Sequence, residues 1–332
     1  MKKNIALVIL IIMALVMFGC SSNETNHFEN NPDSLSSSSS SWLSGLITRV
    51  PVLFGVGDGP LTDQQVRSKG GMGGSSLYWI NTITGSATPI GDIGYYVEGI
   101  AYDAITNKLY GITSDIYAVG SFKQGGGSQL IEIDMATGAG TLIADITGGR
   151  GFSHPTFDSS GTLFALSDPP SDTNLCTIDV INGEANCFPS SLSGGPDYYR
   201  GLAFRKEVLY HILESMDYAV LYTVNTTDGT DNWIRNISGL PHNMAYNGDF
   251  NPVTGVYWGL GTPDYSGEEN FKDGISQNLL IIDIDNGTLL NTIPTIDNLH
   301  AITFGYLNAS TLIKMGLNDL IDFLCPSPNN PE

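Results

Sequence analysis

Between about residues 50 and 306, apolar residues come in short runs separated by Gly, Asn, Asp and Thr, without sustained 3.6-residue periodicity. One phrase recurs with fixed spacing: Leu, two residues, Ile or Val, Asn or Asp, three residues, Gly. Its five copies are 77–85, 130–138, 175–183, 221–229 and 279–287. Their starts lie 53, 45, 46 and 58 residues apart, which is the period of a four-stranded propeller blade.

Each copy belongs to a longer unit of four short runs. Around the first copy these runs read SLYWINTITG, SATPIGD, GIAYDAITN and KLYGITSD. They are rich in β-branched and aromatic residues and end in turn-forming residues, as strands do. The recurring Gly stands where a tight hairpin needs positive φ. The pattern therefore predicts an all-β fold with four strands in each repeat.

The order GIAYD, LYGITSD, LIEID, GTLIAD resembles the inner-to-outer strand order of YVTN-, NHL- and quinoprotein-like β-propellers. In that order, residues 53–58 are a second strand with no inner strand before them, and residues 300–306 are an inner strand with nothing after them. Pairing the two ends would close the ring and remove its open edges. The resemblance implies a five-bladed β-propeller over residues 50–306, closed by its N- and C-terminal strands.

The first twenty residues have the pattern of an export signal. Lys2 and Lys3 precede an apolar run, 5–18, that ends in Gly19-Cys20. A transmembrane helix would need about twenty apolar residues, and this run is shorter. Residues 1–20 resemble a bacterial lipoprotein signal with Cys20 as the lipid-modified residue. Ser21 then implies a protein of the bacterial cell envelope, lipid-anchored to the outer membrane or cell surface.

Two further segments flank the predicted propeller. Residues 21–49 are dominated by Asn and Ser, with six serines at 36–41, and we expect a tether too polar to form a core. In the tail, 307–332, apolar residues at helical spacing predict a short helix near 310–324. We expect it to pack over a face or edge of the propeller, with binding of a partner as the alternative.

The net charge of −20 argues against nucleic acid as a partner, because nucleic-acid binding needs a basic face. Only 14% of residues are charged, so the acidity comes from scarce Lys and Arg rather than from acidic blocks. Solubility, a saline habitat or binding of surface cations would each account for it.

Four cysteines occur in the chain. Cys176 and Cys187 flank the Asn182-Gly183 turn and would face each other across a hairpin, which predicts a disulfide in an oxidising compartment. Cys20 is assigned to the lipid, and Cys325 is left without a role.

Candidate site residues precede the inner strands. Aligning the aromatic residue of each inner strand (Tyr102, Phe157, Phe204, Tyr246, Phe304) predicts equivalent places for Glu98, Ser153, Arg200, His242 and His300. His154 follows one residue later. These positions would ring the mouth of the central channel, on the face that also receives three long loops, 59–75, 116–128 and 262–277. Binding residues concentrate on such loops, so all six residues are ligand-binding candidates.

Two functions remain open for this ring. No nucleophile elbow or cofactor fingerprint is present, which favours a non-enzymatic module that binds a small molecule, a glycan or a protein. Alternatively, Glu98, His242 and His300 would hold a divalent metal. Glu98-Gly99 resembles the Glu-Gly of gluconolactonase-type propellers, where the Glu is a metal ligand; that family's other ligands are Asn and Asp, and this ring has Arg and His. The resemblance implies a metal-dependent hydrolase or lyase.

Overall fold

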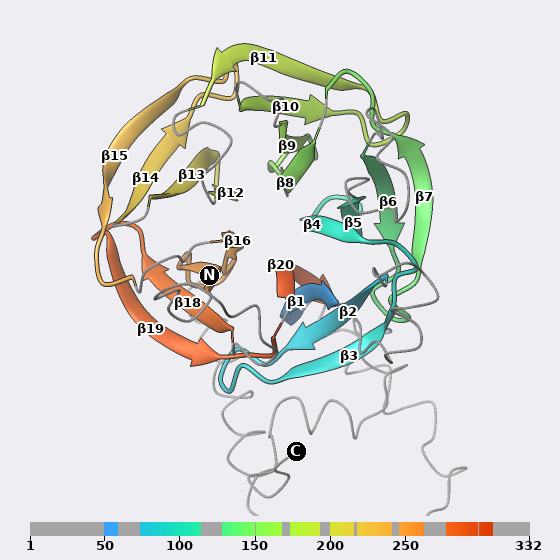
Figure 1. The fold of residues 1–332 in the computed structure, drawn as a ribbon, viewed down its shortest axis with the longest axis horizontal. Coiled ribbons are helices and arrows are strands. Elements are labelled where there is room, and N and C mark those ends of the chain that lie inside the picture. Colours follow the sequence, from blue (N-terminus) through green and yellow to red (C-terminus); the bar gives the residue numbers. More distant parts are fainter. Residues whose placement is uncertain are drawn as a thin grey trace, which may run out of the picture. The chain divides into compact units, whose positions relative to one another are not determined.

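The structure is a computed structural model that describes residues 50–58, 74–113, 128–149, 151–167, 173–192, 200–215, 218–240, 246–261, 277–297 and 299–307. These residues form twenty strands in five four-stranded antiparallel sheets around a central axis (Figure 1). The protein is a five-bladed β-propeller, and the fold class predicted from the sequence is confirmed. Among the described residues there is no helix long or apolar enough to cross a membrane.

Chain segments beyond the propeller are not described. One compact unit covers Pro51–Tyr306, and a second comprises Met1–Val50 and Leu307–Glu332. The expected signal, tether and C-terminal helix fall almost wholly in the second unit, outside the described residues. Most of the three long loops, Cys20 and Cys325 also lie outside the described residues. The expectations about all these segments therefore stay predictions.

Four blades are each built from consecutive strands, counted from the axis outward (Figure 1). Blade 1 contains β4 (Val97–Asp103), β5 (Lys108–Thr113), β6 (Gln129–Ile133) and β7 (Gly140–Asp145). Blade 2 contains β8 (Phe152–Phe157), β9 (Leu163–Ser167), β10 (Asn174–Ile178) and β11 (Ala185–Ser191). Blade 3 contains β12 (Arg200–Arg205), β13 (Val208–Ser215), β14 (Tyr218–Val224) and β15 (Asp231–Ile237). Blade 4 contains β16 (Tyr246–Phe250), β17 (Tyr257–Gly261), β18 (Asn278–Asp283) and β19 (Thr288–Pro294).

Blade 5 is assembled from both ends of the domain. Its strand order is β20 (Leu299–Leu307), β1 (Val50–Asp58), β2 (Ser75–Ile80) and β3 (Ala87–Asp92). β1 pairs antiparallel with β2, with Leu53 opposite Ile80. The ring is therefore closed by its terminal strands, as the incomplete first and last repeats predict.

The recurring Gly of each repeat allows a tight turn and a close contact between neighbouring blades. In the β2–β3 turn, Asn81 Oδ1 accepts the N–H groups of Ile83 and Thr84 at 2.8 and 3.1 Å, and Gly85 adopts φ +76°. A Cβ at Gly85 would overlap the carbonyl oxygen of Pro294 at the end of β19. Gly is thus required both for the turn and for the approach of blade 5 to blade 4.

Apolar side chains fill the space between neighbouring blades. Between blades 4 and 5, Trp258 and Leu260 pack with Ile302 and Phe304, all buried. The rings of Trp258 and Phe304 meet edge to face, with centroids 5.8 Å apart, an arrangement favoured by aromatic quadrupoles. Each blade thus buries the face of the next.

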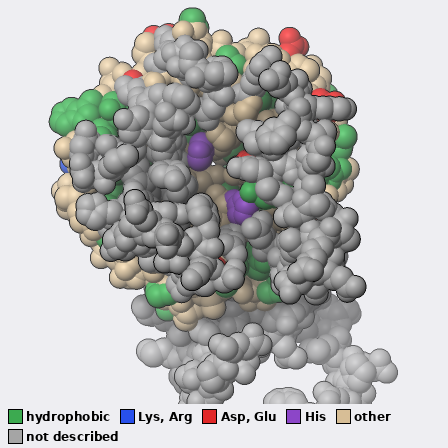
Figure 2. Space-filling model, viewed as in Figure 1, with side chains coloured by type: hydrophobic (Ala, Val, Ile, Leu, Met, Phe, Trp, Pro, Cys, Tyr) green, Lys and Arg blue, Asp and Glu red, His purple; other side chains and the backbone are tan. Residues whose placement is uncertain are grey.

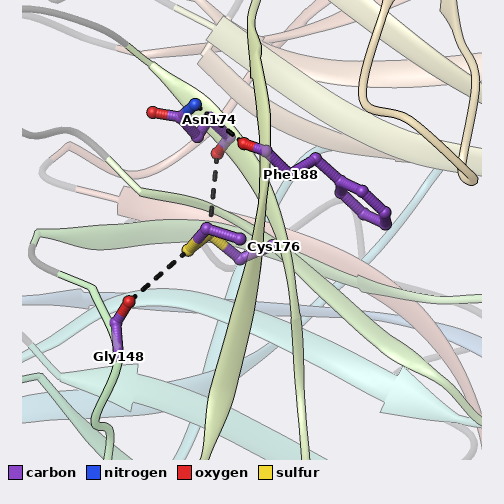
Figure 3. Close-up of a disulfide and its surroundings, with 5 residues drawn as sticks. Gly148, Asn174, Cys176 and Phe188 are labelled. Carbon is purple, nitrogen blue, oxygen red and sulfur yellow. Dashed lines mark hydrogen bonds between the residues drawn. A yellow bond between two sulfur atoms is a disulfide. The ribbon is translucent and has the colours of Figure 1, made fainter.

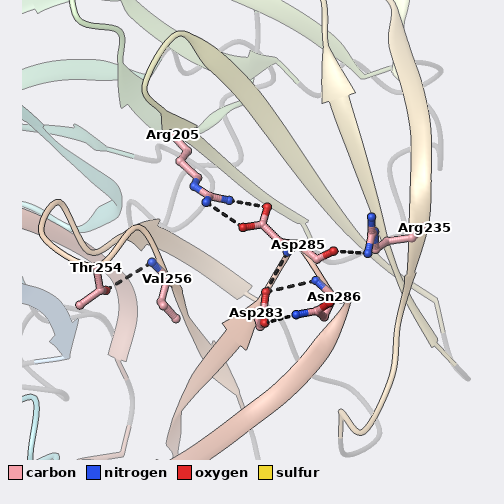
Figure 4. Close-up of polar contacts among 7 residues, drawn as sticks. All are labelled: Arg205, Arg235, Thr254, Val256, Asp283, Asp285 and Asn286. Carbon is pink, nitrogen blue, oxygen red and sulfur yellow. Dashed lines mark hydrogen bonds and ion pairs between the residues drawn. The ribbon is translucent and has the colours of Figure 1, made fainter.

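An ion pair links blade 3 to blade 4. Arg205 donates two hydrogen bonds of 2.8 Å to the carboxylate of Asp285, and Arg235 donates to the backbone oxygen of the same residue (Figure 4). The hydrogen bonds from Arg205 hold the pKa of Asp285 below its usual value and raise the pKa of Arg205. This contact joins the β12–β13 and β18–β19 turns.

The hairpin of β10 and β11 carries a disulfide. Cys176 lies opposite Cys187 in the strand register, and their sulfurs are bonded (Figure 3). Cys176 is fully buried, whereas Cys187 is exposed. The pairing is the one that the spacing around Asn182-Gly183 predicts.

Candidate functional site

The first residues of all the inner strands lie at one face of the ring. Each inner strand runs antiparallel to its neighbour, so the turns that join first and second strands, such as 103–107, lie at the opposite face. We call the residues Glu98, Ser153, His154 and His300, all partly exposed, the mouth. Figure 2 shows two histidine side chains on either side of the opening at the centre of the ring.

Glu98 occupies a β-bulge. Val97 pairs with Thr113 and Gly99 pairs with Ile112, which leaves Glu98 as the extra residue of β4. A bulge re-aims the side chain of the unpaired residue and interrupts the ladder locally. Glu98 is therefore the bulged residue near the start of β4.

His154 has an unusual backbone conformation. Its φ is +51°, and it lies inside β8, where the register shifts between Ser153 and Thr156. The other described non-Gly residues with positive φ, Asn107 and Lys206, lie in turns, where this conformation is common. Positive φ inside a strand is strained and tends to occur at functional positions. This strain singles out His154 among the mouth residues.

His300 contacts the neighbouring blade. Its ring meets that of Tyr96 edge to face, with centroids 5.1 Å apart and an interplanar angle of 71°. Tyr96 lies just before β4, so the contact joins the start of blade 1 to the inner strand of blade 5. It brings an imidazole, a phenol and the Glu98 segment to one side of the mouth.

A third bulge brings a buried polar side chain close to the inner strand of blade 1. Asn247 is the extra residue of β16, between Tyr246 and Gly248, and it is only 2% exposed. Its amide nitrogen lies 3.3 Å from where a Cβ on Gly99 would stand, although blades 4 and 1 are not neighbours. The ring of Pro155 fills the same position from blade 2. Asn247, Gly99 and Pro155 thus lie close together on three inner strands, and we call these three residues the floor.

Asn247 brings an unsatisfied donor to this floor. Its Nδ2 atom is buried and has no hydrogen-bond partner among the described residues. A buried donor left without an acceptor costs about 1–3 kcal/mol. Such a group is compensated by an ordered water or by an oxygen of a ligand.

Asp249 lies two residues further along β16. Its carboxylate accepts the hydroxyl of Thr303 and the N–H of Phe304, each at 2.9 Å, and the N–H of Phe250 at 2.7 Å. Burial raises the pKa of Asp249 to about 6, while these three hydrogen bonds oppose the rise. The side chain joins the inner strands of blades 4 and 5 beneath the mouth.

The register corrects the predicted ring in blade 4. Phe250 pairs with Tyr257, just as Tyr102 pairs with Leu109 and Phe204 pairs with Leu209. The aromatic residue equivalent to Tyr102 is therefore Phe250 rather than Tyr246, and the place that the sequence alignment gave to His242 belongs to Tyr246.

The structure does not test the predicted roles of two site residues. His242 lies outside the described residues, so its role stays a prediction. Arg200 begins β12, opposite Leu213, but the position of its side chain is not described. Glu98, Ser153, His154 and His300 are the candidates that the structure does bring to the mouth.

Within the described part of the chain, no three His, Cys, Asp or Glu side chains are grouped so that they could hold a metal ion. Glu98 and His300 are described, whereas the third expected ligand, His242, is not. The described mouth instead combines a carboxylate, a hydroxyl and two imidazoles, and the floor adds the primary amide of Asn247. Such a mixture of donors and acceptors suits polar, uncharged groups.

No protein-family model matches the sequence, and no curated protein matches it. Among solved structures, a chain of the nidogen/laminin complex is 10% identical, with a TM-score of 0.46, and the match covers 77% of this chain and 98% of that one. TolB from Acinetobacter baumannii is 12% identical, with a TM-score of 0.42; the match covers 74% of this chain but only 52% of TolB. Similarities this weak carry no statement about function.

Sequence reasoning missed Asn247 and Asp249. The Asn-Gly-Asp triplet of residues 247–249 reads as a turn, because these residue types favour turns. The signal that could have identified the register of this strand is Phe250, which stands before the Asn251–Gly255 turn as Tyr102 stands before the 103–107 turn.

Proposed function

We propose that this protein is a membrane-anchored, extracytoplasmic β-propeller that binds a polar ligand, either a small molecule, a glycan or a group on a protein, at the mouth. The main support is Asn247: a buried, unsatisfied amide donor at the floor of an opening lined by polar side chains. A purely structural channel would be filled more favourably by small apolar residues, since an unsatisfied buried polar group is costly.

The strained backbone of His154 supports the same proposal. Its positive φ places an imidazole at the mouth at a conformational cost of about 1–3 kcal/mol. The neighbouring Pro155 adds to the strain, because a residue before proline favours extended conformations. Strained backbone conformations of this kind cluster at binding sites, so a binding role would explain why the conformation of His154 is retained.

Thermal stability in the presence of probes tests the proposal. The full chain would be heated with a panel of neutral mono- and disaccharides, amino acids and peptides, and with Ca²⁺, Mn²⁺ and Zn²⁺. We expect at least one uncharged polar probe to raise Tm in the wild type, because a ligand that binds only the folded state stabilises it. We expect the shift to disappear in Asn247→Ala and to persist in Glu132→Gln, which lies on the third strand of blade 1. A panel without any shift, or a shift unaffected by Asn247→Ala, would count against the proposal.

The metal-dependent hydrolase or lyase is the alternative, and it rests on His242 together with Glu98 and His300. Elemental analysis of protein purified without chelator separates the two functions. A stoichiometric divalent metal that is lost in both Glu98→Gln and His300→Ala would favour the enzyme. Absence of metal from the wild type, together with a probe-induced Tm shift, would favour the binding module.

Anchoring depends on Cys20, and a separate experiment addresses it. We expect the wild type to incorporate labelled fatty acid and to sediment with membranes. Cys20→Ala is expected to do neither, because the thiol that carries the lipid is removed. Equal membrane association of the two proteins would contradict lipid anchoring.

A further inference from the structure

Exposed aliphatic side chains stand at the tips of three turns on the face opposite the mouth. Ile83 is 77% exposed, Ile105 57% and Val253 73%. Two residues before each aliphatic residue stands an Asn or Asp whose side-chain oxygen accepts the backbone N–H of that aliphatic residue. These hydrogen bonds measure 2.8, 2.8 and 2.9 Å. Because these hydrogen bonds fix the turns, the apolar side chains are held projecting into solvent.

The three tips surround the place where the chain enters and leaves the ring. Ile83 belongs to blade 5, and Val253 and Ile105 lie in the first turns of blades 4 and 1 on either side of it (Figure 1). The pairing of Leu53 with Ile80 places the start of β1 beside the β2–β3 turn that carries Ile83. β1 therefore begins beside the turn that carries Ile83.

Charge divides this face into two sectors. Residues 82–86 and 251–255 include no charged residue, and the one charged residue of the 103–107 turn is Asp103, which is buried and caps the turn. Elsewhere on the face the turns carry charged side chains, among them Lys206, Glu207, Asp228 and Asp285. The sector around blade 5 is therefore the part of the face with the lowest cost of leaving water.

We propose that the tips Ile83, Ile105 and Val253 insert into the surface of the lipid bilayer that carries the anchor, so that the mouth faces away from the membrane. This inference rests on the proposed lipid anchoring at Cys20, and it is independent of what the mouth binds. Apolar side chains that enter the interface of a bilayer add to membrane affinity in proportion to the apolar area they bury.

The length of the tether makes a bilayer the expected occupant. Twenty-nine residues, 21–49, separate Cys20 from β1, which corresponds to a root-mean-square span of about 30 Å for a flexible chain. The tips would then be confined within a few tens of ångströms of the bilayer, at an effective concentration on the order of millimolar. Weak insertion of three side chains suffices under that confinement.

Site-specific quenching tests the orientation. Full-length lipidated protein with Cys325→Ser would be reconstituted into vesicles of phosphatidylethanolamine and phosphatidylglycerol that contain a brominated lipid. An environment-sensitive fluorophore would be placed at Ile83→Cys or Val253→Cys. Ile181→Cys is the matched control, because Ile181 is 82% exposed and has the same place in an Asp-capped turn of blade 2, next to charged residues.

We expect brominated lipid to quench the labels at positions 83 and 253 at least threefold more than the label at 181. In the background Ile105→Ser, quenching at position 83 is expected to fall by about half. Protein that is retained on the vesicles but shows equal quenching at all three positions would overturn the membrane orientation and leave the anchor standing. Protein that is not retained at all would overturn both the anchor and the orientation.

Discussion

Asp249 gives the propeller a stability that depends on pH in an unusual direction. Its pKa is about 6 in the folded protein, because burial disfavours the carboxylate, against an ordinary value of 3.8. The folded state therefore binds the proton more tightly than the unfolded state does. The stabilisation is fully present below pH 3.8 and is lost as the pH rises through about 6.

The size of the effect follows from this pKa difference. About two pH units at 1.36 kcal/mol each correspond to about 3 kcal/mol in full, of which about 2 kcal/mol falls between pH 4 and pH 7. Asp249→Asn removes the titration and keeps an oxygen that accepts hydrogen bonds from Thr303 and Phe304. The free energy of unfolding of the wild type should therefore fall by about 2 kcal/mol relative to Asp249→Asn over this range.

Urea denaturation followed by tryptophan fluorescence at pH 4, 5, 6 and 7 measures this difference. Asp228→Asn is the matched control, because hydrogen bonds from Thr230 lower the pKa of Asp228 and its contribution is lost only below pH 3.8. We expect its difference from the wild type to stay constant between pH 5 and 7. A difference between wild type and Asp249→Asn that does not change with pH, or that changes in the opposite direction, would refute the reasoning.

Three other sets of substitutions test the fold. Chemical denaturation should show that Gly85→Ala destabilises the protein by at least about 2 kcal/mol more than Gly94→Ala. Both residues have positive φ, but only at Gly85 would a Cβ meet the backbone of blade 4. Replacing Cys176 and Cys187 by Ser should cost about 2–3 kcal/mol, from the entropy of a loop that spans 11 residues, and reduction of the wild type should lower Tm to the same value. The side chains of Arg205 and Asp285 are 25% and 66% exposed, so their ion pair should contribute only about 0.5–1 kcal/mol in a double-mutant cycle, and less at high salt. A coupling energy that does not depend on salt would contradict an exposed ion pair.

The repeat made most of the propeller predictable. The Leu at the start of each phrase and the Gly at its end report on one hairpin, whose hydrogen bonds and burial are local. Closure was also predictable, because residues 53–58 and 300–306 are each incomplete alone and complementary together. Where the apolar pattern repeats without interruption, the sequence therefore specifies both the number of blades and their order.

The register of the inner strand in blade 4 could not be predicted from its aromatic residues. In blade 4 both Tyr246 and Phe250 fit the pattern, and only the pairing of Phe250 with Tyr257 decides between them. The bulges at Glu98, His154 and Asn247 have no sequence signature, because they depend on how five inner strands share one axis. The floor made by Asn247 and Gly99 joins blades that are not neighbours, which no local pattern reports.

The most direct test of the binding proposal is calorimetric titration of the wild type and of Asn247→Ala with the same panel of uncharged polar probes. Because the probe would supply the acceptor that Asn247 Nδ2 lacks, removing the amide should weaken binding about tenfold or more, which corresponds to about 1.4 kcal/mol. We expect at least one probe to bind the wild type with this dependence on Asn247. Equal affinity of the two proteins for every probe that binds, or no binding by the wild type, would contradict a ligand site at the mouth.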